Sequence, residues 1–134
     1  MATIDAIRIK NLRGLVDTNW IEQKPITILV GKNSAGKSTL ARVYPLLKQS
    51  VSERKQSPIL WFGQYVDFGQ YSVAVHHKSP SASISFAFKI KLTTGELERR
   101  NPAFYSHTKL NNSAETIAVE AEISLAKGVE SNAS

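Results

Sequence analysis

The sequence contains no cysteine, a single methionine and no apolar run of the length that a membrane span requires. Without cysteine, the chain can form no disulfide framework, no thiolate zinc site and no cysteine nucleophile. It also lacks a basic start followed by the apolar stretch of a secretory signal. We therefore expect a cytoplasmic protein with no membrane partner.

Acidic residues are scarcer than basic ones, with 11 Asp and Glu against 17 Lys and Arg, for a net charge of +6. The excess lies in residues 1–100, which hold 15 basic and 7 acidic residues, whereas residues 101–134 hold 2 and 4. No run of five or six basic residues occurs, so the pattern leaves both a solvated basic surface and a nucleic-acid contact open. The 134 residues, 42% of them apolar, suffice for one domain at most.

The most informative segment matches G-x-x-x-x-G-K-[ST], the loop that wraps nucleotide phosphates. It consists of Gly31, Lys32, Asn33, Ser34, Ala35, Gly36, Lys37 and Ser38. The two glycines permit positive φ and a close approach of backbone N–H groups to phosphate oxygens. Lys37 is expected on the β and γ phosphates of ATP, Ser38 on Mg²⁺ and Thr39 on the α phosphate. The loop alone does not distinguish ATP from GTP.

The flanking segments predict the strand, loop and helix that this motif requires. Residues 25–30 are apolar and rich in β-branched side chains, which favours a buried strand. After the loop, Leu40, Val43, Tyr44 and Leu47 share the spacing of one helical face, which predicts a helix over residues 36–50. Pro45 lies inside that helix and is expected to kink it. The expected class is α/β, a P-loop NTPase lobe.

Alternating apolar residues predict strands elsewhere in the chain. A first strand around residues 4–9 ends in a turn at residues 11–14, and a second strand is expected at residues 15–21. Three further segments predict an antiparallel β meander that flanks the loop strand, namely residues 83–92, the start of a returning strand at 97–100 after a turn at 93–96, and residues 116–125. Residues 127–134 are expected to form a frayed tail.

Two separated segments resemble the first lobe of ABC-type head ATPases. They are IRIKNLRG at residues 7–14 and GKNSAGKSTL at residues 31–40. That group includes structural-maintenance-of-chromosomes heads and the prokaryotic overcoming-lysogenization-defect, Septu and retron-associated ATPases of phage defence. YPLLKQSV, PILWFG and YVDFG, which begin at residues 44, 58 and 65, are similar to the bacterial branch. The resemblance covers residues 4–77.

The resemblance implies that ATP and Mg²⁺ bind between two heads, a homodimer in the full-length protein, with nucleic acid or an effector nuclease as further partners. Arg13 matches an arginine that lies near the nucleotide, although a strand-end arginine can equally cap a turn. Gln70 and Gln64 are candidates for a glutamine that helps to hold Mg²⁺ and the attacking water, or they only bind backbone groups.

Other parts of such an ATPase are missing. No apolar run ending in Asp-Glu, no signature motif and no switch histidine follows Lys37. His76, His77 and His107 lack that context, so we expect them to be structural or solvated. Residues 1–126 are thus predicted to be a partial ABC-type ATPase domain that binds ATP without hydrolysing it, with unknown catalytic residues, from a phage-defence or DNA-transaction system. A small P-loop kinase, and a non-hydrolysing interaction or nucleic-acid-binding module with a relic loop, are the alternatives.

Overall fold

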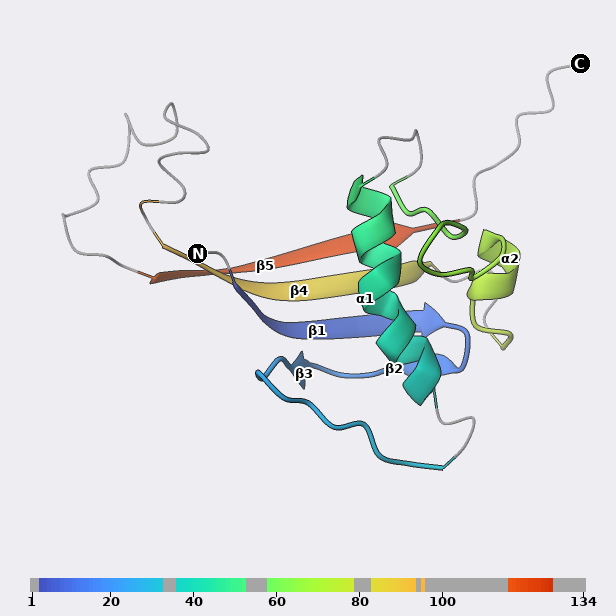
Figure 1. The fold of residues 1–134 in the computed structure, drawn as a ribbon, viewed down its shortest axis with the longest axis horizontal. Coiled ribbons are helices and arrows are strands. Elements are labelled where there is room, and N and C mark those ends of the chain that lie inside the picture. Colours follow the sequence, from blue (N-terminus) through green and yellow to red (C-terminus); the bar gives the residue numbers. More distant parts are fainter. Residues whose placement is uncertain are drawn as a thin grey trace, which may run out of the picture.

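The computed structural model describes residues 3–32, 36–52, 58–78, 83–93, 95 and 116–126. Five strands and two helices make up this part of the chain (Figure 1). They are β1 (Thr3–Leu12), β2 (Leu15–Asp17), β3 (Ile21–Glu22), α1 (Lys37–Ser52), α2 (Tyr71–Ala74), β4 (Ile84–Thr93) and β5 (Thr116–Leu125). The expected mixed α/β class with an antiparallel sheet is confirmed.

All strands of the described sheet pair antiparallel, in the order β2-β1-β4-β5, with β3 also beside β1. The alternating segments at both ends of the chain therefore join one sheet, because β4 lies between β1 and β5. β4 and β5 pair over their full length, from Ile84 opposite Leu125 to Thr93 opposite Thr116. The expected antiparallel pairing of the two long strands is confirmed, but they do not flank a loop strand, since β4 pairs with β1 and residues 25–30 belong to no described strand.

The strand expected at residues 15–21 is divided into β2 and β3. Asn19 has a positive φ of 54°, and its N–H donates to Asp17 Oδ1 at 2.8 Å, which turns the chain away from β1. The Thr18 hydroxyl accepts the N–H of Ile9 at 3.0 Å in place of a strand carbonyl. A local Asx turn thus interrupts an otherwise β-favouring sequence.

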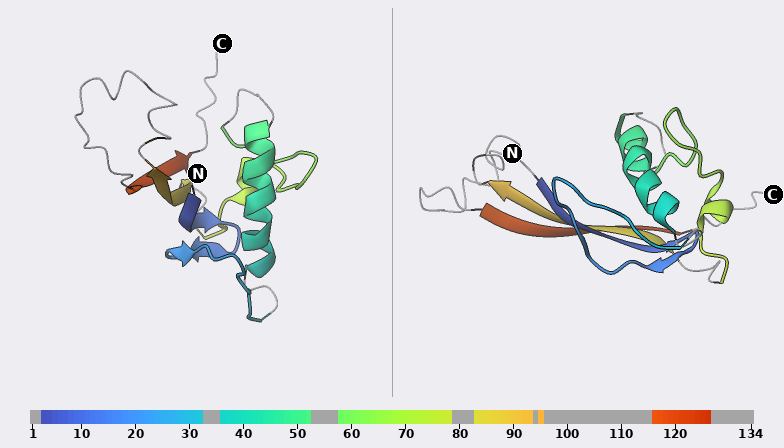
Figure 2. Two further views of the ribbon diagram at one scale, coloured as in Figure 1. Left: turned by 60° about the vertical axis from the view of Figure 1, so that its left-hand side comes forward. Right: turned by 60° about the horizontal axis from the view of Figure 1, so that its bottom comes forward.

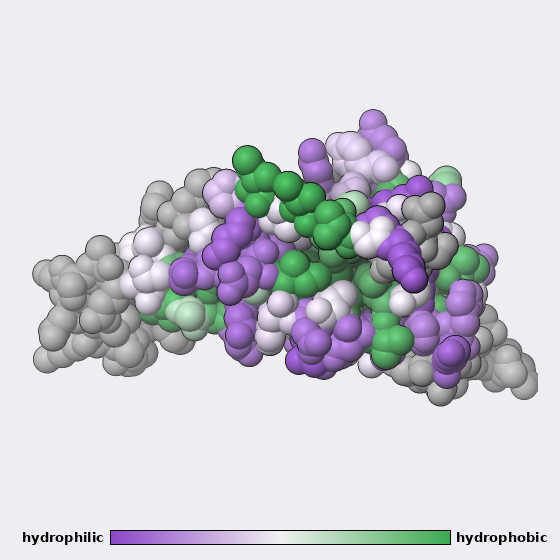
Figure 3. All heavy atoms as spheres, turned by 90° about the horizontal axis from the view of Figure 1, so that it is seen from below, coloured by the Kyte–Doolittle hydropathy of each residue, from purple (hydrophilic) through white to green (hydrophobic). Residues whose placement is uncertain are grey.

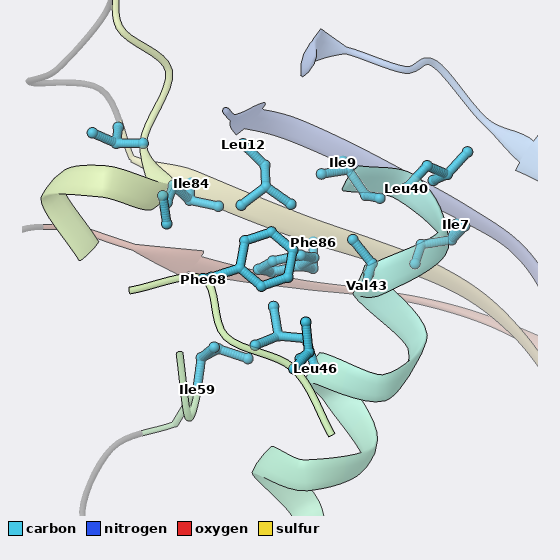
Figure 4. Packing of buried hydrophobic residues seen from close by; sticks show 13 residues of the cluster. Ile7, Ile9, Leu12, Leu40, Val43, Leu46, Ile59, Phe68, Ile84 and Phe86 are labelled. Atoms are coloured by element: carbon cyan, nitrogen blue, oxygen red, sulfur yellow. The ribbon is translucent and has the colours of Figure 1, made fainter. Parts of the chain in front are cut away.

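Helix α1 packs on one face of the sheet (Figure 2). Ile7 and Ile9 of β1 and Phe86 of β4 point toward the helix, where they meet Val43 and Leu46, and all five are fully buried (Figure 4). Burying side chains of this size contributes about 1.5–3 kcal/mol each. The packing of α1 on β1 and β4 therefore contributes several kcal/mol to the stability of the described fold.

The buried face of α1 differs from the predicted one. Leu40 and Val43 are buried as expected, but Tyr44 is exposed and Leu47 only half-buried, while Leu46 and Gln49 are buried instead. The helix runs through Pro45 to Ser52, and a kink at Pro45 stays a prediction. The sheet and the loop after α1 together cover one face of the helix. This buried face is rotated about the helix axis from the face predicted from apolar side chains alone.

Residues 25–30 do not form the predicted buried strand. They connect β3 to α1 along the outside of the fold, and every one of them is exposed (Figure 1). No described strand pairs with them. A β-favouring sequence needs a hydrogen-bonding neighbour to become a strand, and the described residues do not supply one. The predictions at residues 97–100 and 127–134 lie outside the described residues, as do two of the four residues of the turn at 93–96.

Candidate functional site

The helix half of the nucleotide-loop prediction is present at Gly36. Its carbonyl accepts the N–H of Leu40 at 2.9 Å, and α1 begins at the next residue. Gly36 has a φ of +85°, and a Cβ there would lie 2.4 Å from Leu15 Cδ2. Gly31 also has a positive φ, of 151°. Both glycines adopt the positive φ predicted for them, and a side chain at position 36 would be strained and would displace Leu15.

Lys37 bends back over the start of the loop. Its Nζ donates to the carbonyl oxygens of Gly31 and of Lys32, the second at 2.5 Å. The side chain thereby ties the first two loop residues to the first turn of α1. Ser38 is exposed and Thr39 half-buried in that turn. The remaining loop residues, Asn33, Ser34 and Ala35, lie outside the described residues.

Arg13 occupies the turn between β1 and β2, with a φ of 49°. Its N–H donates to Ala74 O at 2.7 Å, and its guanidinium donates to Phe68 O at 3.3 Å. The same guanidinium lies 4.7 Å from the centroid of the Phe68 ring, within the range of a cation–π interaction. These contacts match the expected turn-capping role. A nucleotide contact stays a prediction.

His76 is held by the same turn. Its ring Nδ1 contacts Arg13 O, and its backbone N–H donates to Asn11 O at 2.9 Å. These bonds agree with the expected structural role, whereas His77 is exposed. His107 lies outside the described residues.

Gln70 lies directly before α2. Its carbonyl accepts the N–H groups of Val73 and Ala74, both at 3.0 Å, and its own side chain is exposed and makes no cap hydrogen bond. A bridge between Leu12 and Val75 fixes α2 beside the end of β1. Gln64 is also exposed, in the preceding loop.

Three candidate elements thus meet at one end of the sheet, which we call the turn end. They are the Arg13 turn, the start of α1 and the segment before α2 (Figures 1 and 2). Leu15 links the first to the second through its contact with Gly36, and the Arg13 bonds link the first to the third. Residues far apart in the sequence are brought together here, as a site for one ligand requires.

Gln49 is the residue that sequence reasoning missed. Although buried, it makes four hydrogen bonds to the loop after α1. Its Nε2 donates to Leu60 O at 2.6 Å and to Val66 O at 3.1 Å, while its Oε1 accepts the N–H groups of Tyr65 and Val66 at 3.2 and 3.1 Å. The only signal in the sequence is a polar residue three positions after Leu46, at a helical spacing that continues the buried stripe.

The loop that Gln49 holds carries the aromatic partner of Arg13. Trp61 packs edge-to-face against Phe68 and Tyr71, with ring centroids 6.4 and 6.1 Å apart. This aromatic cluster fixes Phe68, whose ring and carbonyl both bind Arg13. Gln49 therefore helps to position Arg13 at the turn end, because it holds the loop that carries Phe68.

The charged side chains of the described strands all form ion pairs. On the face opposite α1, Arg8 pairs with Asp17 at 2.5 Å and Lys89 with Glu120 at 3.3 Å, and three more ion pairs join Lys10 to Glu122, Lys24 to Glu22 and Lys91 to Asp5. The hydrogen bonds from Arg8 lower the pKa of Asp17 to about 2. Several cations form no ion pair with any carboxylate in the described ranges, namely Arg13, Lys32, Lys37, Arg42, Lys48 and Lys78.

The positive charge left unneutralised thus includes both cations of the turn end, Arg13 and Lys37. Across the described ranges, no group of three or more His, Asp or Glu side chains could hold a metal ion by itself. The Mg²⁺ contact expected of Ser38 stays a prediction. Nor does this part of the chain contain a helix long and apolar enough to cross a membrane.

Comparison of the chain with protein-family models, with curated proteins and with solved structures finds no match in any of the three.

Proposed function

We propose that residues 31–39 bind the phosphates of ATP together with Mg²⁺, and that the chain is the phosphate-binding lobe of an ABC-type head ATPase. One observation carries this proposal. A complete G-x-x-x-x-G-K-[ST] sequence leads into the N-terminus of α1 through Gly36, whose φ of +85° would strain any other residue. The first turn of a helix adds its own positive potential to such an anion site.

The donor set suits a nucleotide phosphate. Lys37 would exchange its bonds to the carbonyls of Gly31 and Lys32 for phosphate oxygens, which are stronger acceptors for an ammonium group. Ser38, one residue further along α1, would offer its hydroxyl to Mg²⁺. When bound, Mg²⁺ neutralises phosphate charge. Arg13 would reach the nucleotide only by leaving the Phe68 ring.

Hydrolysis needs groups that this sequence does not contain, above all an Asp-Glu pair after an apolar run. In the proposal, a further lobe and a second head supply them, the latter in a homodimer of the full-length protein. The chain alone then binds ATP·Mg²⁺ with no turnover. A role in phage defence or another DNA transaction follows only from the resemblance described above.

Calorimetry with ATP and Mg²⁺ on the chain tests the proposal. Lys37→Ala should weaken binding by about 10- to 100-fold, because a hydrogen bond to a charged group contributes roughly 1.5–3 kcal/mol. Lys48→Ala, an exposed lysine of the same helix that contacts Tyr65, is the matched control and should bind like the unmodified chain. The absence of heat from the unmodified chain, or equal binding by the Lys37→Ala variant, would contradict the proposal.

Contact with nucleic acid is the second candidate, because six cations form no ion pair with a carboxylate of the described ranges. A labelled DNA oligonucleotide should then bind with an affinity that falls steeply as salt rises. Binding of DNA by a chain that fails to bind ATP would favour an interaction module with a relic loop. Phosphate transfer to an added acceptor would favour the small kinase.

A further inference from the structure

A groove beside the first turns of α1 opens at the nucleotide loop. Its first cavity, of about 290 Å³, is lined by Gly36 and Lys37 of the motif. The other described residues that line this cavity are all aliphatic, namely Leu15, Ile28, Leu29, Val30 and Leu40. Figure 3, in which the molecule is seen from the side of residues 25–30, shows apolar surface there. The proposed phosphate site and an apolar cavity therefore share two residues.

The walls of this cavity suit the flat face of a nucleobase. Ile28 and Val30 are 78 and 85% exposed, so a base that lies against them would remove apolar surface from water. Pockets for whole ligands usually have volumes of about 300–1,000 Å³, whereas this cavity measures about 290 Å³ and suits only part of a nucleotide. Once the phosphates lie on the loop, that part is the base.

The link between base and phosphates makes a weak contact of this kind effective. Phosphates bound at Gly36 and Lys37 would hold the attached base beside the cavity at a high effective concentration. The apolar wall then adds to the affinity of the nucleotide without having to bind a free base. The continuity of the cavity with the loop is thus what identifies its occupant.

The cavity offers little that could distinguish one purine from another. Lys37 has the only polar side chain among the described residues that line it, and phosphate would occupy that ammonium group. Further polar side chains belong to a second cavity of about 300 Å³, which shares Leu29 and Leu40 with the first. There the Tyr44 hydroxyl already donates to Gln23 Oε1 at 2.6 Å. Tyr44 follows Lys37 by two helical turns, or about 10 Å along the helix axis.

The exposure of the walls weakens discrimination further. Strong discrimination between similar ligands needs buried polar groups that the wrong ligand leaves unpaired. Because Ile28 and Val30 are exposed, water reaches the edge of a base that lies against them and satisfies its donors and acceptors. Adenine and guanine should therefore gain about the same affinity from the groove.

We propose that the groove formed by Leu15, Ile28, Val30 and Leu40 holds the base of a purine nucleoside triphosphate and accepts adenine and guanine alike. The inference rests on the proposed function, because phosphates on residues 31–39 bring the base to the groove. It adds the class of nucleotide, which the loop alone does not specify. A purine is expected rather than a pyrimidine, since its two rings cover more of the apolar wall.

Calorimetry with three probes, each with Mg²⁺, separates the base from the phosphates. The probes are inorganic tripolyphosphate, ATP and GTP. Both nucleotides should bind about tenfold more tightly than tripolyphosphate, and within about fivefold of each other. Ile28→Asn places a polar group on the wall and should remove most of this gain while leaving tripolyphosphate binding unaltered. Ile26→Asn is the matched control, since Ile26 is 81% exposed in the same segment and lines neither cavity. Circular dichroism checks that both variants are folded.

The ratio of nucleotide to tripolyphosphate affinity decides the proposal. A gain for both nucleotides that Ile28→Asn removes and Ile26→Asn preserves supports it. Equal affinities for all three probes, equal effects of the two variants, or a preference of more than about fivefold for one purine overturns it. Tripolyphosphate binding that Lys37→Ala weakens, with no gain for the nucleotides, would overturn the groove and leave the phosphate site in place. If none of the three probes binds, the proposed function fails together with this inference.

Discussion

Replacing Gln49 by alanine should destabilise the fold far more than an average polar substitution. The change removes two donated and two accepted hydrogen bonds that join α1 to the loop after it. Both groups of Val66 that Gln49 binds are buried, but the Val66 carbonyl also accepts the N–H of Gly63 at 3.1 Å. The groups of Leu60 and Tyr65 are only partly buried and can turn to water. The Val66 N–H is therefore the buried group left unpaired, and we expect a loss of about 1–3 kcal/mol.

Urea unfolding followed by circular dichroism measures this loss directly. Gln64→Ala changes an exposed glutamine of the same loop and should stay within about 0.5 kcal/mol of the unmodified chain. A domain of this size is stable by about 5–15 kcal/mol in all, so the effect of Gln49→Ala should be plain. If the two variants have equal unfolding free energies, Gln49 does not hold the loop as described.

Gly63 provides a sharper check on the same contact. A Cβ on Gly63 would lie 2.8 Å from Gln49 Oε1 and 2.9 Å from its Cδ, so alanine there must displace the carboxamide. Gly63→Ala should cost about 1–3 kcal/mol alone and much less in a chain that already carries Gln49→Ala. The double-mutant cycle should give a coupling of about 1 kcal/mol or more. Additive costs would refute the close approach.

Two further variants test individual features of the fold. The pKa of Asp17 is lowered to about 2 by its bonds with Arg8, so its stabilising contribution is complete above its unfolded pKa of 3.8 and is lost as the pH falls toward 2. Asp17→Asn should therefore flatten the fall of melting temperature between pH 4 and 2, and an unchanged profile would exclude Asp17 as its cause. Gly36→Ala combines a φ of +85° with a clash against Leu15 and should lower the unfolding free energy by about 1–3 kcal/mol. Gly14→Ala, with open space around its Cβ position, should change it by less than about 0.5 kcal/mol, and equal effects of the two would contradict the described packing.

The sequence predicted those elements whose signal is local. β4 and β5 alternate apolar and polar residues over their whole length, and α1 carries Leu40 and Val43 at helical spacing. The positive φ at Gly31 and Gly36 follows from a motif of eight residues. Each of these features depends on residues that are close together in the sequence, within a few helical turns or along one strand. Sequence patterns are informative over this range.

What the sequence did not predict depends on contacts between distant segments. The pairing of β1 with β4 joins residues about 80 positions apart, such as Ile7 and Phe88. The sequence of neither strand contains a pattern that identifies the strand with which it pairs. Gln49 is buried because the loop around Val66 happens to present two donors and two acceptors to it. Polar residues on a helix are ordinarily placed at the surface, so periodicity alone assigns Gln49 to the wrong side.

At residues 25–30, the strand predicted from the local sequence does not form. Ile26, Ile28 and Val30 have the β-favouring side chains of a buried strand, yet all three are exposed. Propensity describes how well a residue fits a paired and half-buried surface, and it does not create the neighbouring strand. A prediction that residues 25–30 form a strand therefore also predicts that a second strand lies beside them and forms hydrogen bonds with them.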